Sequence, residues 1–90
     1  MMKKEEKMAQ KNIELSAEFS RYLFEHDEIE AKLPKDAEIV LLPDFDAELR
    51  SYNSAMGKEM EARGEKVCYV RVGALRPRAM SRLEAVAVGV

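Results

Sequence analysis

The sequence predicts a small two-layer α/β domain, in which an N-terminal helix is followed by a β-α-β unit with parallel strands. Its 90 residues are enough for one hydrophobic core and too few for two. Two short apolar runs rich in strand-forming residues, 37–42 and 67–72, flank a segment with helical periodicity. Because two strands joined through a helix form a right-handed crossover, we expect these strands to be parallel.

The N-terminal helix is expected to begin after a polar leader. Residues 1–11 are predicted to be frayed or disordered, and 12–90 to form the single domain. Asn12 suits the N-cap position of the helix. Apolar residues then recur at helical spacing on one face: Leu15, Phe19, Tyr22 and Leu23. A second short turn, capped by Asp27, is expected before Pro34, which ends it.

The first strand is predicted at residues 37–42 and is expected to end at Pro43. Its four consecutive apolar residues indicate a strand that is covered on both faces. Asp44 and Asp46 follow, and both suit the positive N-terminal end of the next helix, where either can act as its cap.

The central helix is predicted to bury one apolar stripe and to end at Gly64. The stripe comprises Leu49, Tyr52, Met56 and Met60. Gly57 lies in the middle of this helix, where glycine costs roughly 1 kcal/mol relative to alanine. Either a neighbouring backbone approaches closely at Gly57, or the cost is tolerated.

Residues 67–72 form the clearest strand of the sequence. Residues 73–77 are then expected to be a loop. The segment 83–90 is predicted as a third strand, with Val86, Val88 and Val90 on one face, and a short helix remains the alternative.

Composition excludes several classes of protein. No stretch approaches the roughly 18 consecutive apolar residues needed to cross a bilayer, and the charged start does not resemble a signal peptide. Cys68 is the only cysteine, so an internal disulfide and a cysteine-rich zinc site are excluded. We therefore expect a cytoplasmic protein without membrane contact.

Three stretches resemble a family of short uncharacterised prokaryotic proteins that is catalogued as a domain of unknown function. They are Asn12 to His26, Ala37 to Pro43, and Val67 to Val72 with Ser81-Arg82-Leu83 beyond. The resemblance covers residues 12 to about 84. It implies a single-domain α/β protein with no assigned activity, and it carries over no functional residue.

Arginines give the strongest charge signal. Residues 66–90 carry five basic residues and one acidic residue, whereas 13–65 carry six basic and fourteen acidic residues. The candidate partner-binding residues are Arg71, Arg76, Arg78 and Arg82. Arginine is enriched at protein interfaces, and it also contacts phosphates, so a protein partner and weak RNA binding both remain open. The acidic body argues against nucleic acid, and solvated or intramolecular pairing is the simplest alternative.

A second candidate site is the loop at 43–48. Asp44 and Asp46, with His26, are the candidate ligand-binding residues for a small molecule or a divalent cation. Acids at a helix N-terminus also have a purely structural explanation, since they interact favourably with the helix dipole. We therefore expect no resident metal. The absence of a glycine-rich phosphate loop predicts no nucleotide cofactor, and we expect no other cofactor.

Two parallel strands form an incomplete sheet with two open edges. The chain is therefore expected to be a homo-oligomer, most simply a homodimer, and more an interaction or accessory protein than an enzyme. A small-ligand or metal-binding protein or minor enzyme is the first alternative, and a weak RNA binder is the second.

Overall fold

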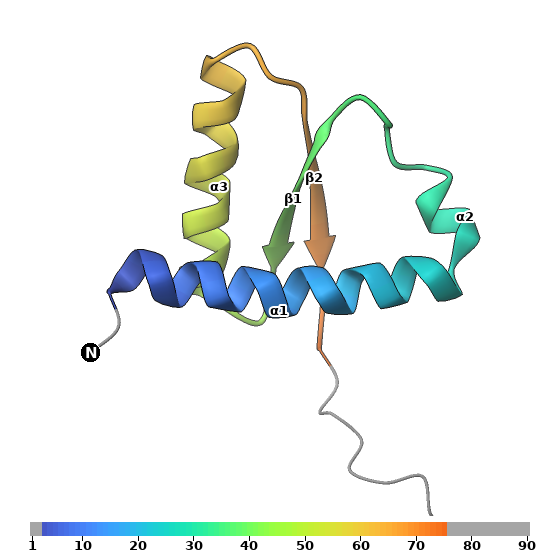
Figure 1. Ribbon diagram of the computed structural model, residues 1–90, viewed down its shortest axis with the longest axis horizontal. Helices are drawn as coiled ribbons and strands as arrows, with labels where there is room; N and C mark the ends of the chain where they lie inside the picture. The colour runs from blue at the N-terminus through green and yellow to red at the C-terminus, as the bar shows by residue number, and fades with distance from the viewer. Residues whose placement is uncertain (1–2, 76–90) are drawn as a thin grey trace, which may run out of the picture.

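The computed structural model describes residues 3–75 of the chain (Figure 1). Its elements in order are α1 Lys4–Glu25, α2 Asp27–Glu30, β1 Glu38–Pro43, α3 Ala47–Ala62 and β2 Val67–Val72. The two strands pair in parallel, from Glu38 opposite Val67 to Pro43 opposite Val72. The predicted α/β class and parallel β-α-β unit are confirmed. The third strand expected at 83–90 lies outside the described residues.

Helix α1 begins at Lys4, so the helix start expected at Asn12 is wrong. Most residues assigned to the leader are good helix formers, and two acids, Glu5 and Glu6, lie in the first turn, where they favour the helix dipole. Met8 lies one turn before Asn12 on the same face and is fully buried. Burial of Met8 extends the apolar face by a turn and stabilises the helix over residues 4–11.

Strand β1 has Val40 and Leu41 buried side by side in sequence, at 1% and 6% exposure. Successive strand residues face opposite sides, so both faces of β1 are covered, as the apolar run predicts. Leu41 packs with Met8 and Leu15 of α1. Val40 lies on the other face with Tyr69, whose ring contacts α3.

The outer edge of β1 is partly closed. The backbone N–H groups of Glu38 and Asp44 donate to the carbonyls of Lys66 and Val72, both at 2.8 Å. The backbone groups of the alternate residues, Leu41 and Pro43 among them, therefore point away from β2. Pro43 has no N–H to leave unpaired at this edge, which explains how the strand continues through it.

Asn53 of α3 closes the same edge. Its side-chain amide donates to the Leu41 carbonyl at 2.9 Å and to Asn12 Oδ1 at 2.8 Å, and it accepts from Asn12 Nδ2 at 2.8 Å. Asn53 is only 1% exposed, so these bonds satisfy a polar group that would be costly to bury alone. One asparagine thus links α1, α3 and β1.

Helix α3 is bounded as the sequence predicts, but its buried face is different. Asp46 is the N-cap, its Oδ1 accepting from Leu49 N at 3.0 Å, and Gly64 follows the helix with a φ of +88°. The fully buried residues of α3 are Leu49, Asn53 and Gly57. Of the predicted stripe only Leu49 is fully buried; the other three members are half-buried.

Gly57 is required by a side chain, not by the neighbouring backbone that the sequence suggested. A Cβ atom at Gly57 would lie 2.7 Å from both Cε1 and Oη of Tyr69. The Tyr69 hydroxyl reaches past Gly57 to hydrogen-bond the carboxylate of Glu61. The glycine thus lets β2 dock its tyrosine ring against α3.

Replacing Asn53 with alanine should lower the free energy of unfolding by about 2–3 kcal/mol, because the Leu41 carbonyl and the Asn12 amide lose their partner. Urea unfolding measures the change. Ser51→Ala, on the exposed side of the same helix, is the control and should change stability by less than about 0.5 kcal/mol. Asn12→Ala and Asn53→Ala should be strongly non-additive, and additive effects would contradict the pairing.

Gly57→Ala should stabilise the protein only when the tyrosine ring is removed. In a Tyr69→Ala background the alanine should add about 1 kcal/mol through helix propensity. In the natural protein the Cβ displaces Tyr69, so the gain should be smaller or reversed. Equal increases in unfolding free energy in the two backgrounds, measured by urea unfolding, would show that the Tyr69 ring is not the reason for a glycine at position 57.

Candidate functional site

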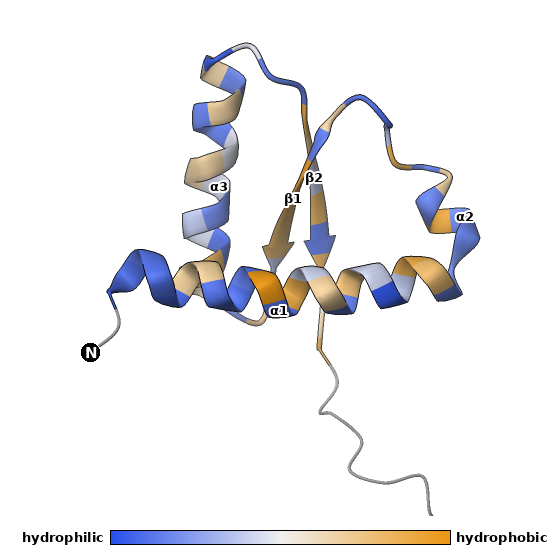
Figure 2. Ribbon diagram, viewed as in Figure 1, coloured by the Kyte–Doolittle hydropathy of each residue, from blue (hydrophilic) through white to orange (hydrophobic). Residues whose placement is uncertain are grey.

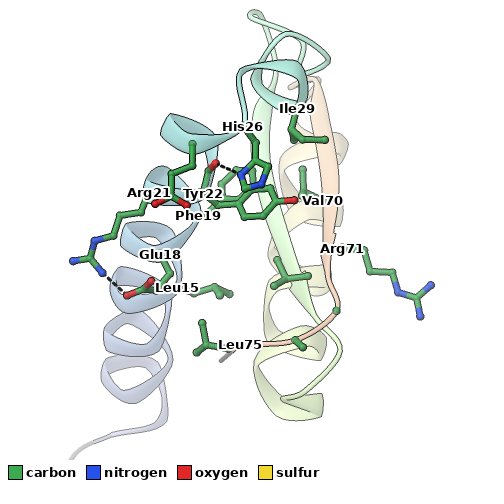
Figure 3. A pocket seen from close by; sticks show the side chains of 14 residues that line it. Leu15, Glu18, Phe19, Arg21, Tyr22, His26, Ile29, Val70, Arg71 and Leu75 are labelled. Carbon is green, nitrogen blue, oxygen red and sulfur yellow. Dashed lines mark hydrogen bonds and ion pairs between the residues drawn. The ribbon is translucent and has the colours of Figure 1, made fainter. Parts of the chain in front are cut away.

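A groove with a volume of about 940 Å³ lies between α1 and β2 in the described part of the chain (Figure 3). We call it the α1–β2 groove. Leu15, Phe19 and Tyr22 of α1 line one side, and Val70 and Val72 of β2 line the other. Ile29 lies at the α2 end, and Leu75 lies at the opposite end.

The groove exists because α1 is longer than the sheet is wide. At 1.5 Å per residue the 22 residues of α1 span about 33 Å, whereas two strands are spaced by only about 4.8 Å. Helix α1 crosses the strand pair and continues past β2 toward α2 (Figure 1). Its C-terminal half therefore overhangs a region in which residues 3–75 place no strand.

Apolar side chains of α1 and β2 line the groove, and polar or charged residues line it as well: Glu18, Arg21, Glu25, His26 and Arg71. Phe19, Val70 and Val72 are partly buried against the core, so these lining residues continue the core surface. Figure 2 shows hydrophobic residues on both strands and at intervals along α1. Arg21 pairs with Glu18 on the solvent side of α1 (Figure 3). Arg71 points away from the groove. Such a surface suits apolar side chains better than a charged ligand.

His26 is held at the end of α1. Its ring stacks on Tyr22, with ring centroids 3.9 Å apart, and Nδ1 lies 2.8 Å from the Tyr22 carbonyl oxygen. Because a carbonyl only accepts, Nδ1 carries the proton, and Nε2 is left as an acceptor. His26 also occupies the N-cap position of α2, so the cap expected at Asp27 is wrong: Asp27 is already the first helical residue.

Asp44 forms an ion pair with Arg71. Arg71 Nε donates to Asp44 Oδ2 at 2.8 Å and to Oδ1 at 3.0 Å, and Arg50 lies 3.8 Å from the same carboxylate. Arg71 remains 80% exposed at its side chain. Asp44 and Arg71 therefore form one ion pair at the carboxyl ends of the strands, although the sequence analysis assigned them to different candidate sites.

Asp46 has a structural role. Its Oδ2 accepts from Lys11 Nζ at 2.9 Å, while Oδ1 caps α3. The Lys11 hydrogen bond is the main cause that lowers the pKa of Asp46 below its ordinary value of 3.8, and the Leu49 amide adds to it. The same pair raises the pKa of Lys11.

The structure does not bring the predicted ligand-binding residues together. Asp46 pairs with Lys11, and His26 follows Lys11 by fifteen residues along α1, a rise of about 22 Å. Asp44 and Asp46 each already bind a cation of the chain. Within residues 3–75 no group of three or more His, Cys, Asp or Glu side chains is arranged to hold a metal ion.

The remaining candidates divide between the two parts of the chain. Arg76, Arg78 and Arg82 lie outside the described residues, so of the four candidate arginines only Arg71 is placed. Cys68 is half-buried in β2. By strand alternation its side chain shares a face with Val70, which lines the groove.

Sequence reasoning missed the two asparagines and the tyrosine. Asn53 falls four residues after Leu49 on the buried face, but its polarity removes it from any apolar pattern. Asn12 is also polar, and it was therefore interpreted as a helix cap rather than as a partner of a buried side chain. The unexplained Gly57 was the one available signal that another side chain packs there, and that side chain is Tyr69.

The fold and the groove define a small α/β domain in which two long helices pack around a single parallel strand pair. A family model for a family of unknown function, DUF5647, matches residues 7–86. The chain therefore belongs to the DUF5647 family. No curated protein and no solved structure matches it. Among the described residues, no helix has the length and apolar character needed to span a membrane.

The Lys11–Asp46 pair predicts a pH-dependent contribution to stability. Asp46→Asn keeps a side chain able to cap α3 but removes the charge, so it should destabilise the protein at neutral pH. A lowered carboxyl pKa contributes stability above the ordinary value of 3.8, and that stability is lost as the pH falls through the lowered pKa. The difference in unfolding free energy between the natural protein and the Asp46→Asn variant should therefore become smaller as the pH falls.

Urea midpoints between neutral and acidic pH measure this difference. In a Lys11→Met background the Asp46→Asn effect at neutral pH should be smaller, because Lys11 is the main cause of the shift. An effect independent of both pH and Lys11 would mean that the carboxylate charge is irrelevant.

Proposed function

We propose that this protein is a non-enzymatic interaction protein that acts as a homo-oligomer, with two copies joined through the outer face of α1. The observation that carries the proposal is the exposure of two large apolar side chains on that face. Ile13 is 71% exposed and Phe24 is 87% exposed. Exposed aromatic and aliphatic side chains on one surface favour a protein partner.

These two residues lie on one line along the helix. Eleven residues correspond to slightly more than three whole turns, so Ile13 and Phe24 point in nearly the same direction, away from the face that buries Met8 and Leu15. Ala17 and Ser20 lie between them and are also exposed. We define the outer face of α1 by these four residues: Ile13, Ala17, Ser20 and Phe24. The small residues at its centre permit a close approach of another helix.

Charge favours a second copy of α1 in antiparallel orientation. The start of the helix is net basic, with three exposed lysines and two exposed acids: Lys3, Lys4 and Lys7, beside Glu5 and Glu6. The other end and α2 carry exposed acids: Glu25, Asp27 and Glu28. An antiparallel pair places Ile13 of one copy near Phe24 of the other, and the basic end of each helix near the acidic end of its neighbour. This arrangement is self-complementary, as a two-fold interface requires.

Ile13→Gln and Phe24→Gln should each weaken self-association at least about tenfold, because each removes an apolar contact twice in a two-fold interface. Light scattering coupled to size exclusion, over a range of concentrations, gives the dissociation constant. Both side chains are exposed in the single chain, so its unfolding free energy should change little.

Glu14→Gln is the matched control. It introduces the same side chain next to Ile13 but roughly 100° around the helix axis, off the outer face. Self-association should be retained in this variant. A protein that is monomeric at high micromolar concentration, or that dimerises equally in all three variants, would refute the proposal.

A further inference from the structure

We propose that the α1–β2 groove is the docking site for residues 83–90 of the same chain, which add to the free edge of β2 as an antiparallel third strand. The inference concerns a surface separate from the outer face of α1 and does not depend on self-association. It rests on the backbone of β2, on the shape and polarity of the groove, and on the length of chain that follows Leu75.

The first step is the edge. Because Lys66 and Val72 direct their carbonyls to β1, the alternate residues Val67, Tyr69 and Arg71 direct their N–H and C=O groups away from it. The hydrogen bonds recorded among the described residues include none to these outward groups. The corresponding edge of β1 is different, since Asn53 binds the Leu41 carbonyl and Pro43 lacks an N–H. The edge of β2 is therefore less obstructed for an incoming strand than the edge of β1.

The second step is the groove. It lies beneath the overhanging half of α1, beside β2, where a third strand would lie, about 4.8 Å from β2 (Figures 1 and 3). Its apolar lining, Phe19, Tyr22 and Val70 among it, requires an apolar face on that strand. Residues 85–90 read Ala-Val-Ala-Val-Gly-Val, so they supply a valine at every second position. A strand with Val86, Val88 and Val90 toward α1 presents such a face.

The third step is the connection. The chain leaves β2 at Val72, and Leu75 lies at the end of the groove. Ten residues, 73–82, separate β2 from residue 83, which is enough for an antiparallel return and shorter than the dozen or more that a parallel crossover needs. The family model also continues beyond the described part, to residue 86.

Charge agrees with this path. The connection contains the basic residues Arg76, Arg78 and Arg82 and no acid. Two acids of α1, Glu18 and Glu25, line the groove, and the uncharged alanines and valines of residues 85–90 avoid adding further acids beside them.

Cys68 provides a direct test in the full-length protein. Its backbone bonds face β1, so a residue opposite it on an added antiparallel strand is in a non-hydrogen-bonded pair, with Cα atoms about 4.5 Å apart. We would introduce Val86→Cys, Val88→Cys and Val90→Cys one at a time, and oxidise each protein in a glutathione buffer. Non-reducing gels and peptide mass spectrometry identify the bridge.

At least one of the three valine positions should form a disulfide with Cys68 within one chain, and Cys68→Ser should abolish it. The matched controls are Ala85→Cys and Ala87→Cys, which lie on the opposite face of the strand and should form it at least about tenfold more slowly. The experiment is repeated in a Phe24→Gln background, in which self-association is expected to be weakened. The result then tests the docking of residues 83–90 independently of the proposed dimer.

A second measurement does not depend on disulfide geometry. Val86→Asp and Val88→Asp should lower the urea midpoint clearly, whereas Ala87→Asp should leave it nearly unchanged, because only the valines enter the groove. No bridge at any valine together with equal effects of the aspartates would overturn the proposal. Bridges formed only between chains would assign the groove to the segment of a second copy and would likewise overturn the assignment to the same chain.

Discussion

The fold depends on one buried amide. Asn53 holds the Leu41 carbonyl of β1 and, in reciprocal hydrogen bonds, the side chain of Asn12 on α1. A second polar link joins α1 to the start of α3: the partly exposed Lys11–Asp46 pair, one residue earlier on α1. Within residues 3–75 the buried hydrophobic residues are Met8, Leu15, Val40, Leu41 and Leu49, and around so small a core these bonds fix the relative positions of the elements. They fix where α1 crosses the sheet, and hence how far its C-terminal half extends beyond β2.

Most elements could be predicted because their signals are local. Pro43, Asp46 and Gly64 delimit a strand and a helix through properties of single residues: a missing N–H, a capping carboxylate and a tolerance for positive φ. The apolar run of β2 and its separation from β1 by one helix were enough to predict parallel pairing. The start of α1 was missed although residues 4–11 are mostly good helix formers, because Asn12 was interpreted as the cap and the burial of Met8 against Leu41 and Leu49 is a tertiary effect.

The candidate sites were less predictable than the fold, for a physical reason. Asp44, Asp46 and Arg71 are charged residues near a helix end and strand ends, and such residues serve binding and structure equally well. Only the distances show that Asp44 holds Arg71 and that Asp46 holds Lys11. The groove could not be predicted at all, since it results from the crossing position of α1 and not from any residue type.

The two edges of the strand pair differ, and this difference limits how strands can be added. A sheet with two free edges can extend indefinitely by adding copies, which is the geometry of a fibril. Here a proline and a side-chain amide obstruct the β1 side, so strand addition is directed to the β2 side. Growth in both directions, which an extended cross-β sheet allows, is therefore hindered.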